Sequence, residues 1–387
     1  MATSTTITIN SRGIYLPVIL VCLDTNSFHE NWYATGESFT LLGDLISKKK
    51  CKVYVSEVAV LEHVRHYAEK SASVASALKN AANTYEKLLE GKVTLPTELP
   101  STEQFEKRFR KCIKELGIEV LPIPGMSHVD IVKRDLKRKK PFDPDGKGYR
   151  DTLCWLGFLN VIDESTSKVI YVTNDAKDHC DSKDETTLHS ELIADIRGKN
   201  RSAPVVRFPA PQVLVKDFVK PLLKEIADED AAAQTLFKAI QNSKYKYFEL
   251  EDVVVEALGN FSAQESSGTF IVESAGLEGP LWVTSLEDPK DVIATALYRL
   301  SNGHFVCEGA AEVTATVEGF LDKFEAFDLS ERGKVFISDP TWNDHYSEVE
   351  LSNVPARISF SFEFEPKSTD ILRFEVNDID GIHPWER

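Results

Sequence analysis

The two ends of the chain carry different hydrophobic patterns. Up to about residue 211, short apolar runs alternate with amphipathic stretches that repeat at helical spacing. Residues 15–24 are nearly all apolar, which is typical of a strand buried on both faces of a parallel sheet. This alternation of strands and helices predicts an α/β domain with a central parallel sheet flanked by helices.

The apolar runs and their flanking residues define the other elements expected in this domain. Further strands are expected over residues 51–56, 118–123, 168–173 and 205–208. Helices are expected over residues 36–49, 57–90, 102–116, 148–161 and 187–197, with a short one opened by residues 174–178. We interpret residues 68–147 as a helical insertion that ends in a basic loop over residues 133–147.

After about residue 268 the pattern changes to the two-residue period of half-exposed strands. Residues 358–365 and 371–376 alternate between apolar and polar side chains, and residues 301–303 carry a hairpin turn signal. Residues before this region have helical patterns, over 212–226 and 228–259. We therefore expect three parts: the α/β domain at 1–211, a helical connector at 212–262, and an α+β domain with an antiparallel sheet at 263–387.

Charge is distributed unevenly along the chain. The protein has 61 acidic and 45 basic residues, a net charge of −16. Residues 226–387 hold 31 acidic and 12 basic residues, net −19, whereas residues 1–225 are net +3. A surface as negative as the C-terminal one repels nucleic acid, so we expect only the N-terminal part to bind it. The acidic part would instead regulate, recruit a protein or support a homo-oligomer.

Cysteine use and the N-terminal sequence bear on the compartment. The six cysteines form no C-x-x-C pair, so neither a zinc ribbon nor a disulfide framework is expected. The chain has no apolar run of the length that spans a membrane. The apolar run that ends at Leu23 follows a polar segment without the basic start of a signal peptide. These features favour the cytoplasm and no contact with a membrane.

Five acidic residues stand at the ends of expected strands or on expected helices: Asp24, Glu62, Asp151, Asp175 and Asp178. Because parallel strands end at the same edge of a sheet, these carboxylates can converge on one pocket. Carboxylates gathered in a cleft repel one another, and a divalent cation relieves that repulsion. Mg²⁺ and Mn²⁺ prefer oxygen ligands, activate water and neutralise phosphate charge, so the pattern predicts a metal site for phosphodiester hydrolysis.

Sequence elements in a fixed order resemble the PIN-domain nucleases over roughly residues 14–210: Leu23-Asp24-Thr25-Asn26, Val55-Ser56 followed by Glu62, the G-x-R-D-x-L-x-W element Gly148–Trp155, and Val172–Asp178. The resemblance implies a central parallel sheet, an acidic pocket and dependence on Mg²⁺ or Mn²⁺. It also implies cleavage of single-stranded RNA by a metal-activated water, without a side-chain nucleophile. The inserted segment between Glu62 and Asp151 is longer than a minimal domain of this family needs, which leaves the substrate open.

The resemblance also assigns a role to each matching residue. Asp24 is implied to be the central metal ligand, with Asp151, Asp175 and Asp178 as further ligands and Glu62 lining the pocket. Supporting side chains are implied to orient the carboxylates and the metal-bound waters: Thr25, Asn26, Thr173 and Asn174. Glu57 lies nearer the strand end than Glu62 and is the alternative to it.

Each acidic residue also has a purely structural explanation. Asp24 can cap the turn that follows it. Asp175 can cap a short helix, with Asp178 favoured in its first turn by the helix dipole. Glu62 taken alone fits an exposed helix face, and Asp151 can pair with the arginine that precedes it.

Basic and aromatic residues near these acids are candidates for contact with nucleic acid. Those expected to contact phosphates are Lys137, Arg138, Lys139, Lys140, Lys147 and Arg150. The alternative is a solvated charge run. Trp32 and Tyr33 could stack on bases, in competition with ordinary packing. His63 and His66 follow Glu62, and a solvated helix face explains them better than a metal site.

The function that these features favour is a metal-dependent endonuclease acting on RNA, of the kind used in bacterial toxin–antitoxin or antiviral-defence systems. One alternative is a binding module that keeps the fold with little or no catalysis. Another is a DNA nuclease or phosphatase that uses the same metal pocket. A flap-type DNA nuclease would be expected to carry a helix–hairpin–helix, and the sequence has no clear G-x-G hairpin for one.

Overall fold

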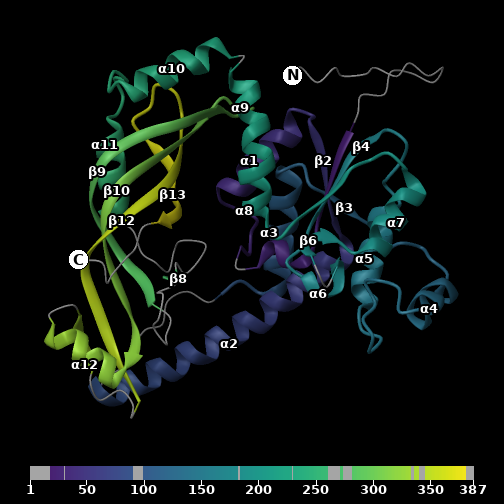
Figure 1. Ribbon diagram of the computed structural model, residues 1–387, viewed down its shortest axis with the longest axis horizontal. Coiled ribbons are helices and arrows are strands. Elements are labelled where there is room, and N and C mark those ends of the chain that lie inside the picture. Colours follow the sequence, from purple (N-terminus) through teal and green to yellow (C-terminus); the bar gives the residue numbers. More distant parts are fainter. Residues whose placement is uncertain are drawn as a thin grey trace. The chain divides into compact units, whose positions relative to one another are not determined.

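The computed structural model describes residues 18–29, 31–89, 99–181, 184–228, 230–259, 271–272, 281–332, 335–339 and 345–380. The chain divides into two compact units, Met1–Lys220 and Pro221–Arg387. Figure 1 colours the N-terminal unit from purple to teal and the C-terminal unit from green to yellow. Each unit is built around a sheet of its own.

The N-terminal unit contains the predicted parallel sheet, in the order β3-β2-β1-β4-β7, and all neighbouring strands in it are parallel. Its strands are β1 (Val18–Leu23), β2 (Cys51–Ser56), β3 (Glu119–Leu121), β4 (Thr166–Val172) and β7 (Val205–Phe208). A separate two-stranded ladder pairs β5 (Cys180–Asp181) with β6 (Asp184–Leu188). The predicted α/β architecture is therefore confirmed, while residues 15–17 of the expected first strand lie outside the described residues.

The helical segments of the N-terminal unit are η1 (Thr25–Phe28), α1 (Glu37–Ser47), α2 (Glu57–Leu89), α3 (Thr102–Glu115), α4 (His128–Leu136), α5 (Tyr149–Leu159), α6 (Ala176–His179), α7 (Ser190–Lys199), α8 (Pro211–Leu214) and the π-helical turn η2 (Val215–Val219). Helix α9 (Lys220–Asp228) follows at the unit boundary. The basic segment at 133–140 was expected to be a loop, but its first residues form the last turns of α4. Ser127 caps that helix, and Ile131 is the apolar residue that anchors it in the core.

Both faces of β1 are buried, as its continuous apolar sequence predicts. Leu20 and Cys22 belong to a core cluster that includes Trp155 of α5 and Leu192 of α7. Val21, on the opposite face, is fully buried as well. Because side chains alternate along a strand, the two faces of β1 are covered separately, and α5 packs on the face that carries Leu20 and Cys22.

An aromatic cluster joins α2 and α3 to the segment that follows β1. Phe28 packs edge-on against Phe109, with 5.1 Å between ring centroids, and His63 lies 4.6 Å from the same ring. His63 was expected on a solvated helix face, but it is only 1% exposed. Burial lowers the pKa of His63 to about 4, so the ring is neutral at physiological pH. The expectation was wrong because α3 covers this side of α2, and sequence spacing does not show which helix covers another.

The C-terminal unit contains the predicted antiparallel sheet, in the order β11-β12-β10-β9-β8, with β13 also paired to β12. Its strands are β8 (Ile271–Val272), β9 (Leu281–Arg299), β10 (Phe305–Asp322), β11 (Phe336–Asp339), β12 (Tyr346–Phe364) and β13 (Ile371–Asp380). The predicted hairpin at 301–303 is confirmed: Gly303 has a φ of 91°, and Phe305 pairs with Arg299.

Helices pack against this sheet within the same unit. They are α10 (Ala231–Gln241), α11 (Leu250–Gly259) and α12 (Lys323–Glu331). Residues 228–259 were expected to be helical throughout, but the helix stops after Gln241 and Ser243 adopts a positive φ of 51°. The interruption lets Phe248 pack edge-on against Phe362 and Phe364 of β12. Within the described residues, no helix is both long enough and apolar enough to cross a membrane.

Gly148 provides a test of how α5 is held in place. Its φ of +107° is unfavourable for other residues, and an added Cβ would lie 2.5 Å from the carbonyl oxygen of Pro141. We expect Gly148→Ala to lower the free energy of unfolding by about 1–3 kcal/mol, measured by urea denaturation. Gly198→Ala on α7, where nothing lies within 4 Å, is the matched control and should be neutral or slightly stabilising. Equal stability of the two variants would contradict this account.

Candidate acidic site

The pairing of β1 with β4 brings together two segments that lie far apart in the sequence. The strands are parallel neighbours, with Leu23 opposite Val172, so Asp24 and Thr173 leave the sheet side by side. The backbone N–H of Asp24 donates to the carbonyl of Val172 at 3.0 Å. The hydroxyl of Thr173 donates to Oδ2 of Asp24 at 2.8 Å. The carboxyl ends of both strands therefore form the floor of one site.

Both oxygens of the buried Asp24 carboxylate have fixed partners. Oδ1 accepts a hydrogen bond from the backbone N–H of Thr25 at 2.8 Å. Asp24 thereby caps η1, which is the structural role expected of it as an alternative to metal binding. The amide of Asn26 lies 3.3 Å from Oδ2 and also contacts the Thr173 hydroxyl. Asn26 in turn accepts the backbone N–H of Asn174 at 3.0 Å. These contacts orient the carboxylate without neutralising its charge.

Glu62 and Glu57 have different surroundings, although both lie on α2. Glu62 accepts a hydrogen bond from the Thr25 hydroxyl at 2.9 Å and pairs with Arg150 of α5 at 2.6 Å. Glu57 instead forms a two-pronged ion pair with Arg110 of α3, at 2.6 and 3.0 Å. Glu62 is thus the α2 carboxylate that shares the Asp24 neighbourhood, and Glu57 fastens α2 to α3.

A cavity of about 620 Å³ opens over this arrangement. It is lined by acidic, aromatic and basic side chains: Asp24, Thr25, Asn26, Phe28, His29, Trp32, Glu62, His63, His66, Glu69, Lys70, Ser73, Asp151 and Asp175. Four of the five carboxylates named from the sequence therefore line one cavity. Asp178 is not among the lining residues.

Asp151 shows the strongest electrostatic effect among these acids. Burial, followed by the nearby charge of Asp24, raises the pKa of Asp151 to about 6, and Glu62 and Asp175 add to the rise. The neighbouring carboxylates thus oppose the ionisation of Asp151, as expected for an acid that shares a cavity with others. A bound cation would reverse this effect.

Asp175 and Asp178 also take the positions in a helix cap that the structural alternative predicts for them. Asp175 caps α6 by accepting the backbone N–H of Asp178 at 3.1 Å, and its own N–H donates to the Thr173 hydroxyl at 3.1 Å. Burial and the charge of Asp175 raise the pKa of Asp178. Oδ1 of Asp178 is buried without a hydrogen bond, and its nearest cation is the ammonium of Lys140, 3.8 Å away.

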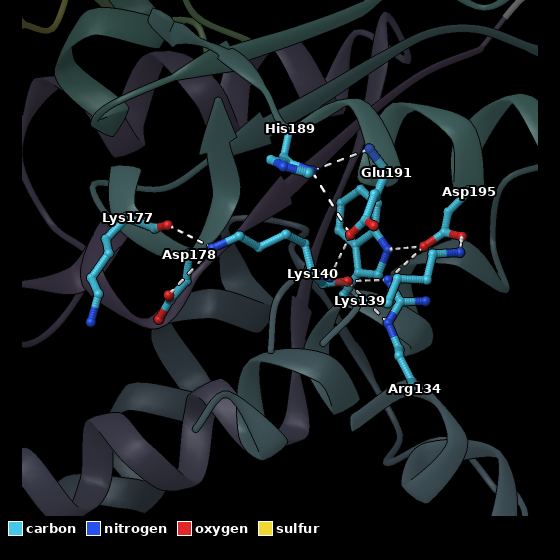
Figure 2. A network of polar contacts seen from close by, with 9 residues as sticks. Arg134, Lys139, Lys140, Lys177, Asp178, His189, Glu191 and Asp195 are labelled. Carbon is cyan, nitrogen blue, oxygen red and sulfur yellow. Dashed lines mark hydrogen bonds and ion pairs between the residues drawn. The ribbon is translucent and has the colours of Figure 1, made fainter. Parts of the chain in front are cut away.

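A polar network holds Lys140 beside Asp178. Figure 2 shows the Lys140 side chain reaching away from the rest of the network toward Lys177 and Asp178. Its ammonium donates to the carbonyl of Lys177 at 2.8 Å, and its backbone N–H donates to Glu191 at 2.9 Å. Arg134 of α4 donates to the Lys140 carbonyl at 3.0 Å. Lys140 is therefore fixed at its backbone as well as at its ammonium.

Asp195 of α7 is the anion at the centre of that network. Its carboxylate accepts from Arg134 at 2.7 Å, from Lys139, and from the indole N–H of Trp155 at 3.1 Å. Burial alone would raise the pKa of Asp195, but the hydrogen bonds from Lys139 and Arg134 outweigh burial and hold it below its ordinary value. The basic segment is thus attached to the domain core by an acid that sequence reasoning did not single out.

The basic residues expected to contact phosphates have unequal freedom. Lys139 and Lys140 are paired with Asp195 and Asp178, and Arg150 is paired with Glu62 while remaining largely exposed. Arg138 pairs with Asp135 on the surface. The side chains of Lys137 and Lys147 are exposed. A phosphate could reach the exposed members without disturbing the core.

His179 is a further group near the acids that the sequence did not reveal. It is fully buried and stacks on Tyr171, with 5.3 Å between ring centroids. Neither ring nitrogen has a hydrogen-bond partner among the described residues. Its charge, when protonated, would lower the pKa of Asp151 and of Asp178. Its position next to Asp178 in the sequence was the one available signal.

The donor set fits a hard divalent cation better than a softer metal. The cavity presents carboxylate oxygens from four separate segments, and burial together with the charge of the neighbouring acids raises the pKa of Asp151. In the part of the chain that the structure describes, no three His, Cys, Asp or Glu side chains already stand in an arrangement that could hold a metal. Side-chain rotation into the cavity is therefore required for binding, and Glu62 would have to loosen its contact with Arg150 to take part.

Comparison with known proteins gives one match. Residues 21–179 match the model of a family described as PIN domain, and the matched segment contains all five candidate carboxylates. No curated protein and no solved structure matches the chain.

Removing the central anion of the polar network should destabilise the N-terminal unit. Asp195→Ala leaves Arg134, Lys139 and the Trp155 indole without their shared acceptor, and we expect a loss of about 3 kcal/mol in the free energy of unfolding. The measurement is urea denaturation followed by tryptophan fluorescence. Asp130→Ala, which removes only an exposed ion pair with Lys133, is the control and should change stability by less than about 0.5 kcal/mol.

The electrostatic coupling of the acids can be measured without any metal. In metal-free protein the Asp151 carboxyl should titrate near pH 6, followed by NMR of ¹³C-labelled aspartate with Asp151→Asn for assignment. The pKa of Asp151 is higher in the folded protein than in the unfolded one, so the unfolded chain ionises first. The free energy of unfolding therefore falls as pH rises through about 6. Asp24→Asn should lower this pKa toward, but not to, the ordinary value, since burial persists. A midpoint near 4 in the unmodified protein would contradict the coupling.

Proposed function

We propose that this protein, whose residues 21–179 form a PIN domain, is a metal-dependent endonuclease that hydrolyses phosphodiester bonds in single-stranded or structured RNA. The PIN domain is a nuclease-type fold, which supports hydrolytic chemistry on nucleic acid. The observation that carries the proposal is the convergence of Asp24, Glu62, Asp151 and Asp175 on one cavity at the carboxyl ends of β1 and β4.

The roles of the residues follow from their contacts. Asp24 is the best-oriented ligand because three hydrogen bonds fix its carboxylate. Asp151 and Asp175 complete the ligand set from α5 and from the end of β4. When bound there, Mg²⁺ or Mn²⁺ supplies an activated water and neutralises charge on the phosphate. Thr25, Asn26 and Thr173 keep the carboxylates in place as charge changes during the reaction.

Asp178 has a different role in this proposal. It lies outside the cavity lining, and Lys140 is the cation nearest to it. We assign it to the support of Asp175, whose carboxylate caps α6 by accepting the backbone N–H of Asp178, and to a ligand position only after Lys140 moves away. Glu62, tied to Arg150, forms the wall of the cavity on the α2 side.

RNA is favoured over DNA because family members of this kind most commonly cut RNA. The alternatives are a DNA nuclease with the same pocket and a binding module without catalysis. All the acids that catalysis needs are present, which favours an enzyme over a binding module. The acidic C-terminal unit would restrain the nuclease, recruit a protein or support a homo-oligomer, consistent with a role in a bacterial toxin–antitoxin or antiviral-defence system.

Cleavage assays test the proposal directly. The full chain should cut labelled single-stranded RNA in the presence of Mn²⁺ or Mg²⁺, and EDTA should abolish cleavage because the carboxylates alone cannot activate water. Asp24→Asn should reduce the rate by at least a hundredfold, in line with the loss of a central metal ligand. Asp252→Asn, an exposed aspartate of α11, is the matched control and should cut like the unmodified protein. Cleavage that survives EDTA or Asp24→Asn would refute the metallonuclease assignment.

Salt dependence tests the basic surface. Replacing Lys137, Arg138 and Lys147 by alanine should weaken RNA binding and reduce the slope of log affinity against log salt by about 2, since each phosphate contact contributes about 0.7 for single strands. Binding is measured by fluorescence anisotropy at several salt concentrations. Replacing Lys238, Lys244 and Lys290, exposed lysines of the acidic unit, should leave the slope unchanged. If the salt slope is unchanged when Lys137, Arg138 and Lys147 are replaced, these residues do not belong to the RNA-binding surface.

A further inference from the structure

The cavity has a second group of lining residues whose chemistry differs from that of the carboxylates. Beyond Asp24 and its neighbours, the wall includes Trp32, His66 and Lys70. His66 and Lys70 are exposed and lie one helical turn apart on α2, so their side chains project from the same face. An aromatic surface and a cation therefore adjoin the site at which we place the metal.

Trp32 is held rigidly, although it is only partly buried. Its carbonyl oxygen lies 3.1 Å from Nε2 of His63, and its indole stacks on the His63 ring at 5.4 Å with 22° between the planes. Tyr67 and Phe105 contact it in edge-on geometry. The His63 ring on which the indole stacks is neutral at physiological pH, since burial lowers the pKa of His63 to about 4. Trp32 therefore offers the cavity a fixed aromatic surface, whose ordering is already complete before a ligand arrives.

The acids in this part of the wall are partly compensated. Glu69 also lines the cavity, and Arg65 pairs with it at 2.7 Å. The Arg65 guanidinium also contacts Nε2 of His66 at 2.8 Å. Among the residues that line the cavity, Lys70 is then the one whose ammonium is available to pair with a phosphate.

We propose that Trp32 and Lys70 form the subsite for the nucleotide adjacent to the scissile phosphate, with its base stacked on the Trp32 indole and a neighbouring phosphate paired with Lys70. The proposal rests on the nuclease function and specifies its substrate class. A base can stack on a side chain only if it is unpaired and unstacked, so the subsite requires single-stranded substrate. Every base has a stacking face, so the subsite tolerates any sequence. A cavity of about 620 Å³ is of the size that holds one small ligand, and a base-paired duplex does not fit it.

Binding experiments in the non-cleaving Asp24→Asn background test the subsite. The probe is a fluorescently labelled ten-nucleotide oligouridylate, and binding is measured by anisotropy. We expect Trp32→Ala to weaken binding about tenfold or more, because stacking of one base on an aromatic side chain contributes on that scale. Trp32→Phe should restore binding to within about threefold. Tyr33→Ala is the matched control: Tyr33 packs on the same Phe105 but does not line the cavity, so binding should be unchanged.

A second probe keeps the test independent of folding defects. The same strand with abasic sugars retains its phosphates and loses its stacking faces. The binding loss caused by Trp32→Ala should disappear with this probe, whereas the loss caused by Lys70→Ala should persist. An equal effect of Trp32→Ala on both probes, or no effect on either, would overturn the proposal.

The two proposals fail in different ways. If the unmodified protein cleaves RNA with Mn²⁺ but binding does not depend on Trp32, the nuclease function stands and the subsite falls. If no cleavage is found while binding of oligouridylate depends on Trp32, base stacking on Trp32 stands as a single-strand binding contact, and the metallonuclease assignment falls together with the position next to a scissile phosphate.

Discussion

The parallel pairing of β1 with β4 is the interaction on which the acidic site depends. It places Asp24 and Thr173 at one edge of the sheet, where the Thr173 hydroxyl donates to the Asp24 carboxylate. The two strands are more than 140 residues apart in the chain, so the site exists only in the folded sheet. Helices α2 and α5 then add Glu62 and Asp151, and Asp175 follows β4. Burial and the crowding of negative charge together raise the pKa of Asp151, and this crowding is unfavourable in the absence of a cation and is sustained by the rigid scaffold beneath it.

Much of the N-terminal fold was predictable, because the central strands β1 and β4 are largely buried and carry apolar runs. Strand β2 has the bounds expected from the sequence, Cys51–Ser56, and the Asn–Gly turn placed the β9–β10 hairpin. The grouping of the acids also followed from topology, since parallel strands end at one edge. The family match over residues 21–179 supports the same domain.

The features that the sequence could not predict depend on which surfaces of the helices and strands pack against one another. His63 and Glu62 are neighbours on α2 and both border the cavity, yet His63 is buried among aromatic rings while Glu62 pairs with Arg150 of α5. Glu57 and Glu62 were indistinguishable by spacing, and the ion pair with Arg110 separates them. The residues around Asp195 in the sequence gave no indication of its role. Its partners are Arg134 of α4, Trp155 of α5 and Lys139 from the segment after α4. Such contacts are set by tertiary packing, which periodicity does not encode.

The lengths of the outermost strands have a consequence for solubility. In the parallel sheet the two edges are its shortest strands, β3 with three residues and β7 with four. A short edge exposes few unpaired backbone groups, so another chain finds little to pair with. In the antiparallel sheet the outermost strands β8 and β11 are also short, with two and four residues, whereas β13 is ten residues long and carries the acidic residues Glu375, Asp378 and Asp380. Both sheets thus end in short strands, and the longer β13 adds negative charge, which is a further means of discouraging edge-to-edge pairing.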